Sequence, residues 1–248
     1  MRKNGDLSPI PASITGIDVS ADPFDIKERI EILKGLENVS YSVGSGPWRI
    51  ADEDFSSPQE EAETLEKIIL EYDAHFIGEC GLDLFHDYGR INTQKELFEA
   101  QIMLSRKLKR PIIIHSRDAA EDTVEILKKN TFSSSGIMHC FSYDKNVMKK
   151  PLDKGLYISF SGNVTYRKNE FIREAAIYCP SDRILYETDS PYLSPVPMRG
   201  KKNRPEYTEY ILSFLSEIRK EDRSALYEKV NENYRRLLSL SEGKGRAD

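Results

Sequence analysis

Short apolar runs alternate with longer amphipathic segments along most of the chain. The runs are rich in Ile, Val, Leu and Tyr and are bounded by Gly, Pro, Asp or Ser, which is typical of strands buried in a parallel sheet. They occupy residues 14–19, 39–44, 75–81, 111–116, 136–141, 156–162 and 183–189. The sequence therefore predicts seven strands.

Helical periodicity is clearest in five other segments, which are residues 22–36, 57–72, 92–110, 206–220 and 224–240. In the first of them Ile26, Ile30 and Leu33 recur with helical spacing. Asp22 and Ser57 are each followed by Pro, and we predict that they cap the first two helices.

Alternation of strands with helices predicts parallel β/α units rather than a sandwich or a helical bundle. The expected fold class is α/β, a TIM-type (β/α) barrel. A closed barrel of this type has eight strands, so seven leave it one short. No linker or change of composition divides the chain. We therefore expect a single domain over residues 1–240 and a disordered tail at 241–248.

Composition excludes several classes of protein. Of the 248 residues, 31% are charged and 39% hydrophobic, and no apolar run is long enough to span a bilayer. The net charge of −5 gives no general attraction to nucleic acid, so binding to a polyanion would need a local basic patch. Cys80, Cys140 and Cys179 lack metal-site or disulfide spacing and suggest reduced thiols. We expect a cytoplasmic protein with no membrane association and no obligate protein partner.

Four residues with metal-binding chemistry stand at or near the ends of four apolar runs: Glu79, His115, His139 and Asp189. The catalytic groups of parallel β/α folds lie at the carboxyl ends of strands, where the loops converge. A lone strand-end His is more often a core residue than a ligand, but two of them with a Glu and an Asp favour a hydrolytic metal centre.

Strict alternation along a strand places residues two positions apart on the same face. Glu79 would then share a face with Ile77, and each of the two histidines would share a face with the Ile two positions before it. The ligands would then stand above an apolar barrel interior. Cys80 and Cys140 would face the helices as packing residues.

Six segments together resemble the TatD family of metal-dependent deoxyribonucleases, in the amidohydrolase superfamily. They are GECGLD, PIIIHSRDAAEDTVEIL, MHCFS, GLYISFSGNVTY, ETDSPYLSPVPMRGKKN and ENYRRLL. The resemblance implies a barrel with up to two divalent cations (Mg²⁺, Mn²⁺ or Zn²⁺) at its mouth. It assigns Glu79 to bridge them, and His115 and His139 to the second. Asp189 would bind the first cation and act as the catalytic residue on the attacking water.

One departure from the family is plain, because its members carry a His-x-His pair at the end of their first strand and this sequence has none. The run 14–19 aligns with the family's second strand, which predicts a barrel incomplete at the N-terminus and a weakened first metal site. Either the true start lies upstream, which we favour, or the site has been lost. The runs 14–19 and 183–189 would then be edge strands in need of cover. Asp18 could substitute as a ligand, although a turn-capping role is more typical.

Candidate substrate-binding residues follow the metal ligands. Arg199, Lys201 and Asn203 lie in a basic loop beyond Asp189, which suits a phosphate backbone or is simply solvated. Arg117 could bind a phosphate in a bidentate manner or pair with nearby carboxylates.

Roles close to the site remain open for several further residues. Glu187 either supports a metal ligand or pairs with a basic residue lower in the barrel. Asp83 either orders the loop after its strand or is a plain turn residue. Trp48 and Tyr166 could stack on bases or pack locally, and His86 is a weaker candidate for substrate contact.

We therefore expect a deoxyribonuclease that uses metal-activated water to hydrolyse the phosphodiester bonds of DNA, with single-stranded DNA among the candidate substrates. Two alternatives stay open. One is an amidohydrolase acting on a small cyclic amide or ester, since the same ligands suit carbonyl activation. The other is a non-catalytic barrel that has lost its first metal site.

Overall fold

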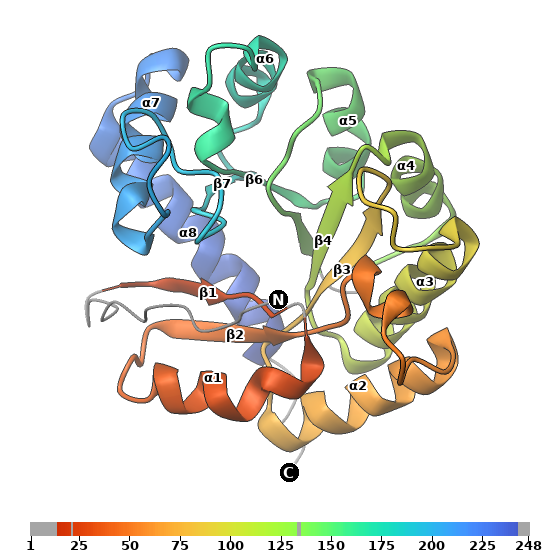
Figure 1. Cartoon of the computed structure of the whole chain (residues 1–248). Helices are drawn as coiled ribbons and strands as arrows, with labels where there is room; N and C mark the ends of the chain where they lie inside the picture. Colours follow the sequence, from red (N-terminus) through yellow and green to blue (C-terminus); the bar gives the residue numbers. More distant parts are fainter. Residues whose placement is uncertain (1–13, 21, 133–134, 243–248) are drawn as a thin grey trace.

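The computed structural model describes residues 14–20, 22–132 and 135–242. Within them, parallel strands form one seven-stranded sheet whose spatial order follows the sequence from β1 to β7. The strands are β1 (Gly16–Asp18), β2 (Val39–Val43), β3 (Phe76–Asp83), β4 (Ile112–Arg117), β5 (Gly136–Met138), β6 (Tyr157–Phe160) and β7 (Ile184–Tyr186). The sheet curls and carries helices on its outer face (Figure 1). For the described residues, the predicted α/β class with seven parallel strands in a curled, barrel-like sheet is confirmed.

A helix connects each pair of successive strands, as parallel pairing requires, and two further helices follow the last strand. They are α1 (Ile26–Leu33), α2 (Pro58–Tyr72), α3 (Ile91–Leu108), α4 (Ala120–Lys129), α5 (Lys145–Asp153), α6 (Glu170–Tyr178), α7 (Thr208–Arg219) and α8 (Arg223–Glu242). Residues 241 and 242 belong to α8, contrary to the predicted tail, and 243–248 lie outside the described residues.

The predicted N-caps are confirmed. Ser57 accepts a hydrogen bond from the Glu60 amide at the start of α2, and Asp22 accepts one from the Phe24 amide in the short turn before α1. Helices α4, α5 and α6 were not predicted. Each has nine or ten residues and buries two or three side chains.

Two apolar clusters hold the sheet to its helices. The larger extends from β3 to β7 and includes the fully buried Phe98, Ile114 and Phe160. The smaller lies around β2 and includes Ile77 together with Leu65 of α2. The pairing of β3 with β4 shifts register between Ile77 and Cys80. The expected alternation of Ile77 with Glu79 on one interior face is therefore wrong, because an irregularity of this kind re-aims the side chains that follow it.

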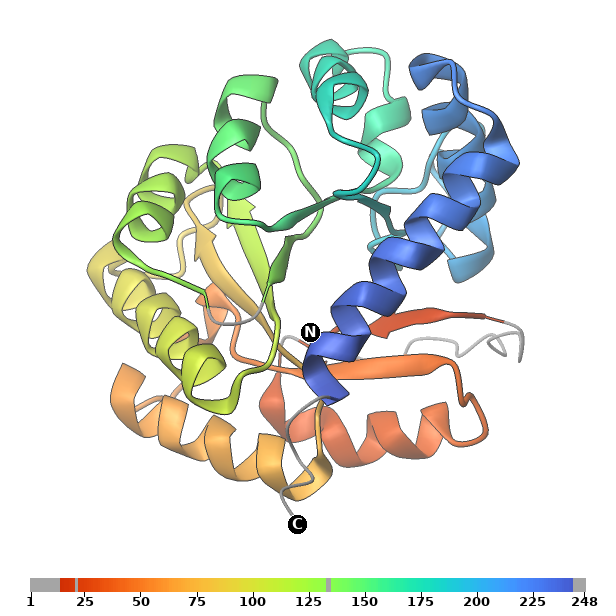
Figure 2. The same cartoon turned by 180° about the vertical axis from the view of Figure 1, so that it is seen from behind.

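Helix α8 covers the open side of the sheet, where β1 and β7 each have a strand on one side only among the described residues. Asn233 donates hydrogen bonds of 2.9 Å to the carbonyl oxygens of Ser181 and Ile184, beside β7. The adjacent Tyr234 hydroxyl donates to the carbonyl of Gly16 in β1 at 3.0 Å. Seen from behind, α8 crosses from one edge of the sheet to the other (Figure 2). The segment that covers the two edge strands is therefore α8 of the same chain.

No helix in the described part of the chain is long and apolar enough to cross a membrane. All three cysteines are free thiols.

Candidate metal centre

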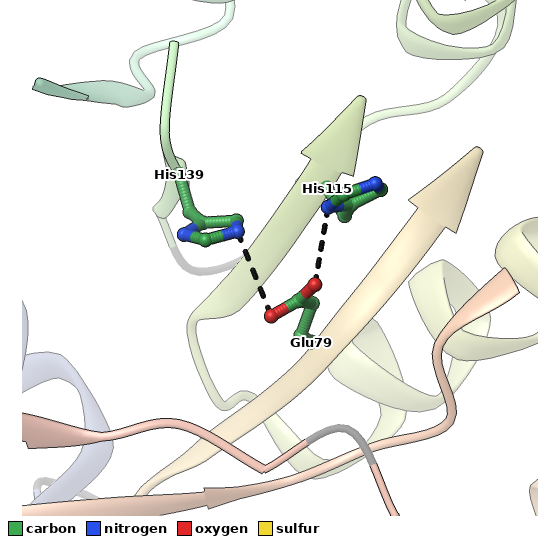
Figure 3. A group of neighbouring side chains, drawn as sticks. All are labelled: Glu79, His115 and His139. Carbon is green, nitrogen blue, oxygen red and sulfur yellow. Dashed lines mark ion pairs between the residues drawn. The ribbon is translucent and has the colours of Figure 1, made fainter. Parts of the chain in front are cut away.

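Three side chains from adjacent strands converge at the carboxyl end of the sheet. Glu79 comes from the middle of β3, His115 from β4, and His139 from the turn that follows β5. His115 Nδ1 lies 3.1 Å from Glu79 Oε1, and His139 Nε2 lies 3.5 Å from Glu79 Oε2. Ligand atoms of all three fall within 4.8 Å of one another (Figure 3). This geometry brings together three of the four predicted metal ligands, all except Asp189.

Close packing of β3 against β4 sets the spacing of the group. Gly81 pairs with His115 in the ladder and has a φ of +138°. A Cβ at this position would overlap the carbonyl oxygen of His115, so only glycine lets the two strands approach this far.

A second carboxylate supports each histidine from behind. His139 Nδ1 lies 2.8 Å from Glu187 Oε1, and His115 Nε2 lies 3.4 Å from the buried Asp83 Oδ2. Each imidazole therefore lies between Glu79 on one side and a supporting acid on the other. Metal-binding histidines typically have this arrangement, because the second carboxylate fixes the ring orientation and raises the basicity of the ligand nitrogen.

The electrostatics of the group follow from its burial and its mixed charges. Burial lowers the pKa of His139, but Glu187 and Glu79 outweigh it and raise that pKa well above its ordinary value. Burial likewise lowers the pKa of His115, and Asp83 and Glu79 reverse this effect, so that its net pKa is raised. Burial raises the pKa of Glu79, yet His139 and His115 hold it well below its usual range. The site thus gathers several carboxylates around two imidazoles, and protons on the imidazoles balance part of their negative charge.

These residues fit a divalent cation. One carboxylate and two imidazoles are ligands that suit Zn²⁺ and other borderline or hard divalent cations. In addition, His115 Nε2 is buried without a well-directed hydrogen bond, so the ring is incompletely satisfied. A cation bound between the three side chains would take the place of the compensating protons.

Asp189 lies beside this group but outside it. It follows β7 by three residues, in a left-handed conformation with φ of 58°. Its Oδ2 is 3.9 Å from Cys140 Sγ, next to His139 in the chain. Burial raises the pKa of the Asp189 carboxyl to about 6, against the lowering effect of His139. A carboxylate with such a pKa is suited to accept a proton near neutral pH.

With this fold and site in place, comparison with known proteins identifies the family. The family model for TatD related DNase matches residues 12–239. The chain belongs to the TatD family. It is 37% identical over 205 residues to the uncharacterized metal-dependent hydrolase YcfH of Escherichia coli, covering 82% of this chain and 75% of YcfH. It is 36% identical over 220 residues to the uncharacterized metal-dependent hydrolase BU355 of Buchnera aphidicola, covering 88% and 82%. This TatD protein is thus a metal-dependent hydrolase.

Solved structures agree on the fold of the TatD protein. The crystal structure of YJJV, a TatD homolog from Escherichia coli, has a TM-score of 0.83 at 24% identity and covers 91% of this chain and 87% of that chain. An organophosphorus hydrolase mutant from Deinococcus radiodurans shares the architecture with a TM-score of 0.63 at 14% identity, covering 92% and 79%.

The environments of Asp18 and Cys140 exclude the less favoured ligand role of Asp18 and correct the predicted orientation of Cys140. Asp18 does not approach the metal group, because its carboxylate forms a 2.6 Å ion pair with the buried Arg29 of α1. Cys140 does not face the helices. It adopts a left-handed conformation with φ of 48° in the turn after β5, and its Sγ lies 3.1 Å from Ser161 Oγ and close to Asp189.

The predicted substrate-binding residues occupy different environments. The guanidinium of Arg117 is exposed and lies 3.9 Å from the ring centre of Phe85. That of Arg199 is exposed and lies 4.4 Å from the ring centre of Tyr166, and Lys201 is also exposed. None of these three cations forms an ion pair with a described residue.

Asn203 is buried and supports a loop, whereas the sequence predicts that it contacts the substrate. Its side chain is 3% exposed and donates to the carbonyls of Thr188 and Tyr192, at 2.7 and 2.5 Å. These bonds hold the loop that carries Asp189, and no donor of this amide is left for a substrate.

Asp83 is the site residue that sequence reasoning undervalued. The sequence predicts either a loop-ordering role or a plain turn role for Asp83; the structure shows that it orders the loop and also reaches His115. Its separation from Glu79 by four residues on one strand could have indicated a shared face. Glu187 takes the first of its two predicted roles and supports His139.

Proposed function

We propose that this protein hydrolyses phosphodiester bonds of DNA, with Glu79, His115 and His139 holding a divalent cation and Asp189 acting as general base. The observation that carries the proposal is the carboxylate-supported group of three ligands beside a buried Asp whose pKa is raised to about 6. A bound divalent cation supplies a more acidic water and positive charge near a phosphoryl oxygen.

The residues of the chain have separable tasks in this proposal. Glu187 and Asp83 hold the two imidazoles in place. Asp189 accepts the proton of the attacking water, and the bonds from Asn203 fix its loop. A second cation would have to share Glu79 and rely on Asp189, so we infer that one cation binds more tightly than a second.

DNA as the substrate is supported by the charge distribution. The protein has a net charge of −5, yet the end of β4 and the loop after β7 present the exposed cations Arg117, Arg199 and Lys201 without ion pairs to described residues. Unpaired cations beside a metal centre suit a phosphate backbone, which every DNA sequence offers.

Replacement of the general base tests the proposal. Asp189→Asn keeps the size of the side chain but cannot accept a proton, so Mn²⁺-dependent cleavage of single-stranded DNA should fall by at least about a hundredfold. Circular dichroism should show an unchanged fold. The matched control is Asp153→Asn, an exposed carboxylate on α5, which should cleave like the wild type.

Three results would contradict the proposal. One is cleavage by Asp189→Asn at the wild-type rate. Another is hydrolysis of lactones or cyclic amides with no cleavage of DNA by the wild type, which would assign a small-molecule substrate. The third is a folded wild-type protein that takes up no Mn²⁺ or Zn²⁺.

A further inference from the structure

A continuous series of rings leads from the metal centre to an exposed loop tip. Trp48 contacts His115 edge-on, with ring centres 5.7 Å apart, and Tyr88 lies 6.1 Å from Trp48. His86 follows at 5.2 Å and Phe85 at 4.9 Å. Phe85, His86 and Tyr88 belong to the loop between β3 and α3, at the carboxyl end of the sheet (Figure 1). We call Trp48, Phe85, His86 and Tyr88 the aromatic platform.

The tip of the platform is exposed to a degree that packing does not explain. Phe85 is 58% exposed, and the preceding Leu84 is 43% exposed. Large apolar side chains are normally buried, because each transfer from water stabilises the fold. Other large apolar side chains of the protein are exposed as well, but these two adjoin Asp83, whose carboxylate lies 3.4 Å from His115. Their position therefore makes them available to a ligand at the metal group.

The loop is held rigidly despite this exposure. Asp83, which is 2% exposed, accepts the amides of Phe85 and His86 at 2.9 and 3.0 Å and lies 2.9 Å from His86 Nδ1. Gln94 of α3 bonds both backbone groups of Asp83. The same Asp83 carboxylate contacts His115, so the platform has a fixed position relative to the metal ligands. A preformed surface binds without the entropic cost of ordering a loop.

Arg117 adds a charge to the platform. Its guanidinium stacks on the Phe85 ring at 3.9 Å and has no carboxylate partner among the described residues. A stacked guanidinium keeps its in-plane N–H donors free, and these match the oxygens of a phosphate. An exposed ring next to an unpaired cation is complementary to a nucleotide, which joins a flat base to an anionic phosphate.

A surface hollow continues the platform. Tyr88 lines a cavity of about 410 Å³ between residues 50–58 and 88–96, together with Arg90 and Glu96. Because these two side chains carry opposite charges, the hollow suits a base and its sugar better than a second phosphate.

We propose that the aromatic platform binds an unpaired nucleotide of the substrate strand, with its base stacked on Phe85 and its phosphate on Arg117. The proposal rests on the nuclease function above and specifies its substrate class as single-stranded DNA or a frayed end. A base-paired strand keeps its bases stacked inside the duplex, so the rings would have nothing to contact without unpairing.

Binding measured without cleavage tests the platform. The probes are a fluorescently labelled oligothymidylate, its duplex with oligoadenylate, and an abasic oligomer of the same length. Affinity is measured by anisotropy on the full chain, first with a chelator and then with the Mn²⁺-loaded Asp189→Asn protein. Trp48 is the only tryptophan in the chain, so its emission reports independently on occupancy of the platform.

The expected pattern separates base contact from phosphate contact. Phe85→Ala should weaken binding of oligothymidylate about tenfold, within the range of base-stacking losses on alanine substitution. It should leave the abasic oligomer unaffected, and Phe85→Tyr should restore affinity. Arg117→Ala should weaken binding of both single-stranded probes. The control is Phe171→Ala on the outer helix α6, which removes a similarly exposed ring and should change nothing.

Two outcomes would contradict the proposed role of the platform. In one, the wild-type protein does not bind oligothymidylate or binds the duplex more tightly. In the other, Phe85→Ala binds oligothymidylate with the same affinity as Phe171→Ala. Failure of the nuclease function looks different, because binding would still depend on Phe85 while the wild type cleaved nothing. If cleavage occurs and binding is independent of Phe85, the function stands and the platform does not.

Discussion

At the scale of single residues, each histidine of the candidate metal centre contacts two carboxylates, and these contacts should govern how tightly the site binds a metal. Glu79 faces the metal position from one side, whereas Glu187 and Asp83 support the imidazoles from the other. Removal of a supporting acid should therefore weaken metal binding without removing a ligand.

Glu187→Gln tests this support. Glutamine can still accept a hydrogen bond from His139 Nδ1 but no longer supplies the negative charge, so Mn²⁺ or Zn²⁺ affinity should fall about tenfold or more. Titration against a chromophoric chelator measures it. Glu174→Gln is the matched control, because Glu174 forms an exposed ion pair with Lys145 far from the site. Equal metal affinities in the two variants would refute the role of Glu187.

The pH dependence of hydrolysis should report Asp189. Burial raises its pKa to about 6, and only the deprotonated carboxylate can act as a base. Activity should therefore be full above this pKa and decline as the pH falls through it. A cation next to Asp189 favours the charged form and moves the decline to lower pH. The profile of kcat/KM against pH measures this, and an acidic limb well above pH 6 would count against Asp189.

At the scale of elements, α8 is the part of the fold that holds the two sheet edges together. Its neighbouring residues Asn233 and Tyr234 bond to opposite edges, at Ile184 of β7 and Gly16 of β1. A three-residue edge strand has few ladder hydrogen bonds of its own, so these side-chain bonds contribute to its position.

Asn233→Ala should destabilise the protein by about 1–3 kcal/mol, because it leaves two carbonyl oxygens beside β7 without their donor. The free energy of unfolding in urea measures the change. The adjacent Glu232→Ala removes an exposed side chain that pairs only with Lys229, and it should be close to neutral. If Asn233→Ala were as stable as this control, α8 would not have the bridging role.

At the scale of the whole molecule, the described sheet is an open arc, with its most deeply packed strands in the middle. The apolar residues of β4 are buried and β4 has a strand on each side, whereas β1 is only half-buried and has one. Local stability should follow this gradient, since strands with few packed neighbours open most readily.

Hydrogen–deuterium exchange should reveal the gradient. Amides in Gly16–Asp18 should exchange much faster than those in Ile112–Ile114 under native conditions. Mass spectrometry of peptides from the two strands measures both in one sample. Equal protection of β1 and β4 would mean that the open edge is stabilised as well as the centre.

The sequence by itself determined the seven strands and the parallel β/α class, and it singled out the three candidate metal ligands that the fold brings together. Apolar runs such as 111–116 are periodic and local, and a ligand such as His115 is fixed by its place on one strand. These features depend on neighbours in the chain, which a pattern records directly.

Only the tertiary structure decided how these parts meet. The irregular register of β3 put Ile77 under α2 and freed Glu79 to face both histidines. Side-chain contacts between distant segments made Asp83 a partner of His115 and took Asn203 into the Asp189 loop. Such features arise from contacts between residues far apart in the chain, which no local pattern contains.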